Sequence, residues 1–181
     1  MKRADRTAVR DAVVAVLRAQ VLAVGGRIYR SRVWPMTTQP GVLPVQMPAL
    51  LVYATPEVKR RSHTLASVDK LYRTSCDVVV IARATPPPGE GAPEVRLEAL
   101  LEDLAATIEG AVLTAPTLMG GEGAVEDCEE VRTEIAMDPE AGQIVGHAVL
   151  VFSLVWSEAW SVPLPDTCDD PVVALAPAFP S

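Results

Sequence analysis

The side chains of this 181-residue chain that most often carry chemistry are its three cysteines and two histidines. Cys76, Cys128 and Cys168 lie far apart with neither CxxC nor Cys/His spacing, so we predict reduced structural thiols rather than metal or redox centres. His63 lies in a basic segment and His147 in an apolar one, and neither has partners at ligand spacing. The spacing therefore predicts no metal site and no cofactor.

A glycine-rich segment at residues 119–127, MGGEGAVED, has the texture of a phosphate-binding loop. It lacks the Lys-Ser/Thr pair of a P-loop and precedes a predicted strand, so a phosphate would gain no helix N-terminus. Glu129 and Glu130 follow it, but neighbouring residues of a strand point to opposite faces, which argues against a carboxylate dyad. With no GxSxG or HExxH motif either, we expect a protein that is not an enzyme.

Charge is divided unevenly along the chain. Residues 1–73 carry 13 basic side chains against four acidic ones, whereas residues 74–181 carry three basic side chains against 19 acidic ones. The net charge of −7 therefore hides a positive first part and a negative second part. Such a separation can produce solvated faces, or it can let the positive surface of one subunit meet the negative surface of the next.

The charged residues of the predicted strands and loops are the most plausible functional surface. We interpret them as a candidate contact between subunits or with a partner protein: Arg27, Arg30, Arg32, Lys59, Arg60, Arg61, Glu129, Glu130 and Glu134. The basic members could instead bind DNA phosphates, although no helix-turn-helix, zinc finger or aromatic-interleaved strand accompanies them. A plain solvated face is a further alternative. A small-molecule enzyme is another, and a deep pocket with convergent polar groups would support it.

Two helices are expected to support this surface. Apolar residues recur at helical spacing through residues 4–24, and Gly25-Gly26 ends that helix. A second helix runs from residue 94 to about residue 113, after the breaker TPPPGEGAP, with a leucine-rich buried stripe.

Strands are predicted at 71–83 and 126–137, where apolar and polar residues alternate, and at 27–34, where the alternation is imperfect. Two more are predicted at 49–55 and 143–157, which are apolar on both faces. Residues 126–137 and 143–157 form a hairpin linked through residues 138–142, and the two apolar faces of residues 143–157 predict a central or covered strand. Residues 35–48 are a proline-studded loop, and the polar residues 57–70 are expected to form a long loop. The sequence therefore predicts an α+β fold: a mixed, mainly antiparallel sheet of about five strands with two helices packed on one face.

We expect one domain over residues 1–160 and a proline-rich tail or arm over residues 161–181, where no periodicity remains. The charged N-terminus MKRADRTAVRD lacks the apolar stretch of a secretory signal. The longest mainly apolar run, residues 148–156, is too short to span a bilayer, so we predict a soluble protein made in the cytoplasm without a membrane partner.

In the order and texture of its elements, the chain resembles phage tail-terminator proteins, also called minor tail protein U-like or tail-completion proteins. The resemblance covers about residues 3–158 and rests on VGGRIYRSRVWP (24–35), MPALLVYAT (47–55), LYRTSCDVVVIAR (71–83), EALLEDLAATIEGAV (98–112) and TEIAMDPEAGQIVGHAVLVFSLVW (133–156). The proline-rich tail has no counterpart in it. Neck and head–tail joining proteins share a similar order of elements, so a neck or head–tail connector protein contacting DNA in the channel is the alternative.

The resemblance implies a small fold that assembles with itself as a ring, commonly a hexamer. Such a ring caps the finished tail tube, ends tube polymerisation and presents a surface for joining the head. Its expected partners are other copies of the chain, the tail tube protein and a connector or neck protein, with DNA only passing through the ring. The implied location is the virion, at the tail end near the neck, after assembly in the host cytoplasm.

Overall fold

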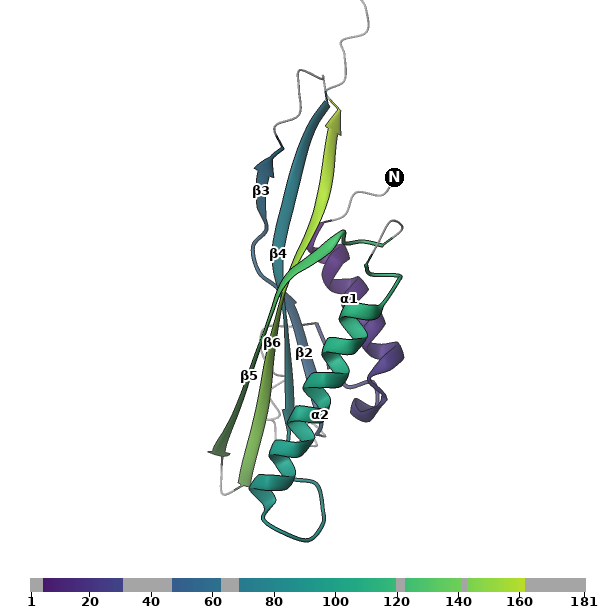
Figure 1. Ribbon diagram of the computed structural model, residues 1–181. Coiled ribbons are helices and arrows are strands. Elements are labelled where there is room, and N and C mark those ends of the chain that lie inside the picture. Colours follow the sequence, from purple (N-terminus) through teal and green to yellow (C-terminus); the bar gives the residue numbers. More distant parts are fainter. Residues whose placement is uncertain (1–4, 31–46, 63–68, 120–122, 141–142, 162–181) are drawn as a thin grey trace, which may run out of the picture.

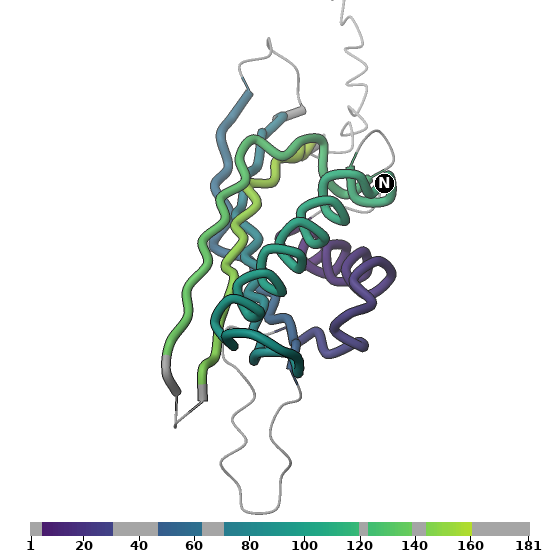
Figure 2. The backbone as a smooth tube through the Cα atoms, turned by 60° about the horizontal axis from the view of Figure 1, so that its bottom comes forward, coloured from purple at the N-terminus to yellow at the C-terminus, as the bar shows by residue number. Residues whose placement is uncertain are grey.

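The computed structural model of the protein describes residues 5–30, 47–62, 69–119, 123–140 and 143–161. Its elements follow the order α1 (Arg6–Gln20), the 3₁₀ turn η1 (Leu22–Val24), β1 (Ile28–Tyr29), β2 (Ala49–Ala54), β3 (Val58–Arg61), β4 (Asp69–Ala84), α2 (Pro93–Thr114), β5 (Asp127–Glu140) and β6 (Gln143–Ser161). Both α-helices lie on the same face of one long, twisted sheet (Figure 1; Figure 2).

The sheet has six strands in the order β1-β2-β4-β6-β5, and β3 pairs with β4 outside this path. Only β1 and β2 are parallel, and every other pair is antiparallel. The predicted α+β class, with a mixed and mainly antiparallel sheet and two helices on one face, is therefore confirmed. One strand more than the expected five is present, because a segment predicted as loop joins the sheet.

That segment is residues 57–70, where the prediction of one long loop is wrong. Val58–Arg61 forms β3 against residues 72–75 of β4, and β4 already begins at Asp69. The four residues VKRR show little apolar alternation, so periodicity could not reveal a strand that is largely exposed. Pairing with the neighbouring strand supplies the order that the side-chain pattern does not predict.

The first helix is shorter than expected. Asp5 caps it by accepting a hydrogen bond from the Ala8 backbone N–H at 2.7 Å, and α1 ends at Gln20 rather than running to residue 24. The separate turn η1 follows and closes at Gly25, whose φ of 55° is the left-handed conformation that glycine adopts easily. The predicted stop at Gly25-Gly26 is thus in place, with a tightened last turn before it.

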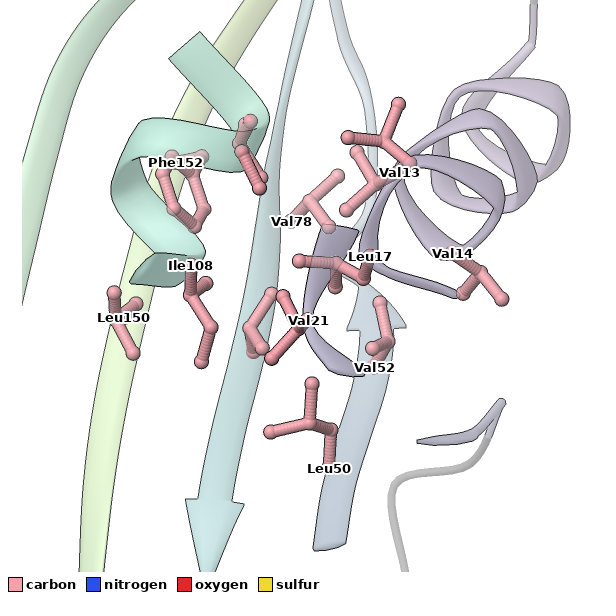
Figure 3. Packing of buried hydrophobic residues seen from close by; sticks show 14 of the residues in the cluster. Val13, Val14, Leu17, Val21, Leu50, Val52, Val78, Ile108, Leu150 and Phe152 are labelled. Atoms are coloured by element: carbon pink, nitrogen blue, oxygen red, sulfur yellow. The ribbon is translucent and has the colours of Figure 1, made fainter. Parts of the chain in front are cut away.

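The main core fills the space between the helices and the sheet. Figure 3 shows side chains from α1, α2, β2, β4 and β6 meeting there, among them Leu17, Leu50, Val78, Ile108 and Phe152. All five are fully buried. Since the contributing segments are far apart in sequence, this one cluster joins both ends of the described chain into a single unit.

Gly146 of β6 lies close under α2. A Cβ atom added there would lie 2.6 Å from the Leu101 Cδ1 atom and 3.1 Å from the Leu97 side chain. Even an alanine would therefore require these leucine side chains to move. Glycine at this position provides space under α2 rather than backbone freedom.

Strand β6 lies between β4 and β5, which confirms that the strand apolar on both faces is central. Leu150, Phe152 and Leu154 are buried under the helices. Val149 and Val151, on the other face, are half-buried. The long β5–β6 hairpin is also confirmed, although β5 continues to Glu140, beyond the residue 137 at which it was expected to turn.

Two further predictions fall partly outside the described residues. Of the strand expected at 27–34, only Ile28–Tyr29 is a strand, Arg30 is not, and residues 31–34 are not described. The predicted tail, 161–181, is likewise outside the description except for Ser161, the last residue of β6. No helix in the described part of the chain is long and apolar enough to cross a membrane.

Candidate assembly surface

The predicted interface residues lie along two opposite margins of the sheet. Lys59, Arg60 and Arg61 form most of β3, which pairs with β4 on the same side as β1 and β2. Glu129, Glu130 and Glu134 lie on β5, the last strand at the other margin. Arg60, Arg61 and all three glutamates are exposed. One molecule therefore carries a basic margin and an acidic margin, with β4 and β6 between them.

The remaining basic residues near β1 are engaged within the molecule. Arg27 is half-buried, and its Nε atom donates a hydrogen bond to the Pro48 carbonyl oxygen at 2.8 Å. Arg30 is exposed, and its guanidinium lies 3.5 Å from the Asp11 carboxylate of α1. Arg27 thus holds the chain beside β2 through this hydrogen bond. Arg32 lies outside the described residues.

The acidic pair does not follow the expected alternation. The β5–β6 register shifts between Cys128 and Glu130, so Glu129 is the extra residue of a bulge. Glu129 accepts from the Arg73 guanidinium at 2.6 Å, and Glu130 lies 3.5 Å from Arg132. Because a bulge breaks the two-residue repeat, the prediction that these two carboxylates point to opposite faces by simple alternation is wrong here.

Their partners show which face they reach. Arg132 also lies 3.7 Å from the Asp77 carboxylate, and Arg73 and Asp77 alternate with Thr74 and Cys76 on β4. Thr74 and Cys76 are buried on the helix side of the strand. Glu129 and Glu130 therefore both contact charges on the face away from the helices, where the ion pairs stay exposed.

A buried polar cluster lies beside the basic margin, and the sequence reasoning missed it. Glu158 of β6 is only 4% exposed. Its two carboxylate oxygens accept hydrogen bonds from Lys59 Nζ, at 2.9 and 2.8 Å. Thr74 Oγ1 and Trp156 Nε1 also donate to it, at 3.0 and 3.1 Å. Lys59 lies on β3, Thr74 on β4 and Glu158 on β6, so the cluster connects three adjacent strands.

Lys59 is the centre of this polar cluster. Its Nζ atom also lies 3.1 Å from Glu57 and 5.5 Å from the centre of the Trp160 ring, a distance suited to a cation–π contact. Trp156, Glu158 and Trp160 follow a two-residue spacing, which on an extended strand places them on one face. That spacing, which continues beyond the predicted strand end at residue 157, is the signal that could have revealed the cluster.

The pKa values of Lys59 and Glu158 shift in the directions that favour the charged form of each group. Burial alone would lower the pKa of Lys59, but hydrogen bonds to Glu158 and Glu57 outweigh it and raise the pKa above 10.5. Burial alone would raise the pKa of Glu158, but the hydrogen bonds from Lys59, Thr74 and Trp156 lower it below 4.5. Both groups therefore remain charged across the neutral range.

The thiols and the histidine do not join these charged groups in a larger arrangement. Burial raises the pKa of the Cys76 thiol to about 11, and burial also raises the pKa of Cys128. His147 Nδ1 lies 4.0 Å from Asp138 on the β5–β6 hairpin. Within the described residues, no three or more His, Cys, Asp or Glu side chains are grouped so that they could hold a metal ion. His63 and Cys168 lie outside those residues.

No protein-family model matches the chain, and no curated protein matches it. The arrangement is therefore defined by its own features: a helix-backed sheet, two margins of opposite charge and a buried ion pair beside one of them.

Proposed function

We propose that this protein is a structural subunit of a phage tail, a tail terminator that assembles as a ring of identical copies, most simply a hexamer. The ring caps the tail tube, ends its polymerisation and provides the surface to which the head or neck joins. Its partners are its own copies, the tail tube protein and a connector or neck protein. It has no catalytic task, and DNA meets it only by passing through the ring in the virion.

The observation that carries this proposal is the placement of opposite charges on opposite margins of one sheet. Arg60 and Arg61 are exposed at one margin, and Glu130 and Glu134 are exposed at the other. Two different surfaces that complement each other make a head-to-tail contact, which repeats from copy to copy and closes as a ring when the rotation allows. The order of elements in the resemblance supports the more specific role at the tail end.

The experiment measures the mass of the assembly by native mass spectrometry and its shape by negative-stain microscopy, with and without tail tubes from the same phage. We expect rings on their own or at tube ends, and shorter tubes when the protein is added during polymerisation. Reversing the two exposed charges of the basic margin with Arg60→Glu and Arg61→Glu should leave mainly monomers, because two acidic margins then face each other across the contact.

A matched control reverses two exposed arginines of α1, with Arg6→Glu and Arg18→Glu, and should keep the ring. Adding Glu130→Arg and Glu134→Arg to the β3 reversal should restore assembly. An oligomer mass unchanged by the β3 reversal would rule out this contact. Tubes of unchanged length would rule out the terminator role, and DNA binding at low salt that depends on Arg60 and Arg61 would favour the connector alternative.

A further inference from the structure

We propose that neighbouring copies join by main-chain strand pairing, with the outer edge of β3 in one copy adding to the outer edge of β5 in the next. This inference rests on the proposed ring and names the contact that builds it. The result would be one sheet that continues from subunit to subunit, with the charges of the two margins selecting the partner strand.

The β3 edge offers the required main-chain groups. The Ser62 N–H donates to the Leu71 carbonyl oxygen of β4 at 2.9 Å, which sets the phase of the β3–β4 ladder. Since the direction of main-chain groups alternates along a strand, the N–H and C=O groups of Arg60 point toward β4, and those of Lys59 and Arg61 point away. No described strand pairs with that outer side. An exposed row of this kind is a template for another strand.

The β3 edge is also held in place before any partner arrives. The Lys59 side chain reaches across β4 and forms its two hydrogen bonds with the buried Glu158 carboxylate. Val58 nevertheless remains 52% exposed, and Arg60 and Arg61 extend into solvent. A strand already fixed in extended form loses less conformational entropy when it pairs than a loop would.

The complementary edge belongs to β5. Of the described strands, only β6 pairs with β5, so one side of this 14-residue strand is open. The strand carries Glu129, Glu130 and Glu134 against the single basic residue Arg132. The acidic character of this long edge matches the basic character of β3, whereas two β3 edges or two β5 edges would repel each other.

Strand direction fits the same arrangement. Strand β3 is antiparallel to β4, β4 to β6, and β6 to β5, so β3 and β5 run in opposite directions in one molecule. Two copies placed side by side in the same orientation would therefore pair β3 with β5 in the antiparallel manner. The β3 and β5 edges lie at different heights along the sheet. Val58 and Asp127, the first residues of the two strands, are both level with Ser75 of β4, and from there the strands run in opposite directions. The neighbour must accordingly be displaced along the strands.

The competing explanation is that both edges are protected against pairing. A short edge strand, a bulge and charged side chains are all devices by which proteins prevent strand addition, and β3 and β5 show them. Under that explanation, the ring would be held by side chains only. A test must therefore separate the main-chain N–H of an edge residue from its side-chain charge.

Arg61 permits this separation. Arg61→Pro removes both the charge and the outward N–H, and leaves the inward groups of the β3–β4 ladder intact, whereas Arg61→Ala removes the charge alone. We expect Arg61→Pro to weaken ring assembly at least about tenfold more than Arg61→Ala, as measured by mass photometry across a dilution series. Circular dichroism and thermal unfolding at low concentration show whether each variant is folded.

Hydrogen exchange on the wild-type chain provides a second measurement that needs no variant. The outward N–H groups of Lys59 and Arg61 should exchange fast in the monomer and become protected in the ring. The inward N–H groups of Arg60 and Ser62 should be protected in both states, and serve as the internal control. Peptide fragments resolved to single residues distinguish the two sets.

The outcomes keep the two proposals separate. Rings that form normally in Arg61→Pro, or a ring in which the outward N–H groups exchange as fast as in the monomer, overturn strand pairing and leave the ring proposal standing. A wild-type chain that stays monomeric both alone and with tail tubes overturns both proposals.

Discussion

The sheet has two parts that are stabilised in different ways. Under the helices, β2, β6 and the second half of β4 bury a continuous apolar cluster (Figure 1; Figure 3). Beyond the helices, β3 with residues 69–75 of β4 and residues 155–161 of β6 forms a three-stranded extension (Figure 1). Its central side-chain contact is the Lys59–Glu158 ion pair, supported by Thr74 and Trp156.

The difference shows how a protein can stabilise part of a sheet that no helix covers. Apolar burial is additive and non-directional, so the covered part tolerates small shifts but loses free energy with every buried carbon removed. A buried ion pair is directional, and it stabilises only while all its partners are present. The extension should therefore respond to the loss of one hydrogen-bonding group, and the covered part to the loss of volume.

The largest expected effect is in the covered part. Phe152 is fully buried, and Phe152→Ala should lower the free energy of unfolding by about 3–5 kcal/mol because it removes transfer energy and leaves a cavity. Val151→Ala on the same strand is the matched control, since Val151 is only half-buried on the opposite face. It should cost roughly 1 kcal/mol. Urea denaturation followed by circular dichroism measures both, and equal losses would contradict the assignment of the core to the helix side.

The covered part is also the part that the sequence predicted best. The periodic apolar residues of α1, α2 and β4 reveal both an element and its buried face, because burial itself imposes the period. Even there, α1 ends at Gln20 rather than at the expected residue 24. The local sequence only weakly determines the residue at which a helix or strand ends. In the folded chain, hydrogen bonds at the end of the element determine it.

The extension was predicted poorly for a physical reason. Strand β3 gains its order from pairing with β4 and from the Lys59 contact with Glu158, which is 99 residues away. No local pattern encodes a partner at that distance. The opposite charges of the candidate surface were visible as composition, but their placement on opposite margins depends on strand order, which composition does not contain.

A smaller but sharper effect is expected from the ion pair. Glu158→Gln keeps the shape of the side chain and removes its charge, and it should lower the free energy of unfolding by about 1–3 kcal/mol. Hydrogen exchange at β3 should accelerate more than exchange at β2, because Lys59 loses its buried partner. Glu102→Gln on the exposed side of α2 makes the same chemical change and should have almost no effect. Equal acceleration in β2 and β3 would mean that the pair does not act locally.

The dependence of this effect on pH follows from the direction of each pKa shift. The lowered pKa of Glu158 gives stability that is full above its ordinary value of 4.5 and is lost as the pH falls through the lower folded value. The raised pKa of Lys59 gives stability that is full below 10.5 and is lost as the pH rises through the higher folded value. The difference between wild type and Glu158→Gln should therefore be constant at neutral pH and shrink in acid.

The smallest effect is expected from a second ion pair, which joins the extension to β5 and has similar chemistry but lies in solvent. Arg73 and Glu129 approach to 2.6 Å, yet their side chains are 59% and 50% exposed. Water screens such a pair, so Arg73→Ala should change the free energy of unfolding by less than about 0.5 kcal/mol, and less still in 0.5–1 M salt. A loss above roughly 1 kcal/mol in urea denaturation would contradict this. It would mean that the open face is stabilised by its charges, and that burial is not what separates the two pairs.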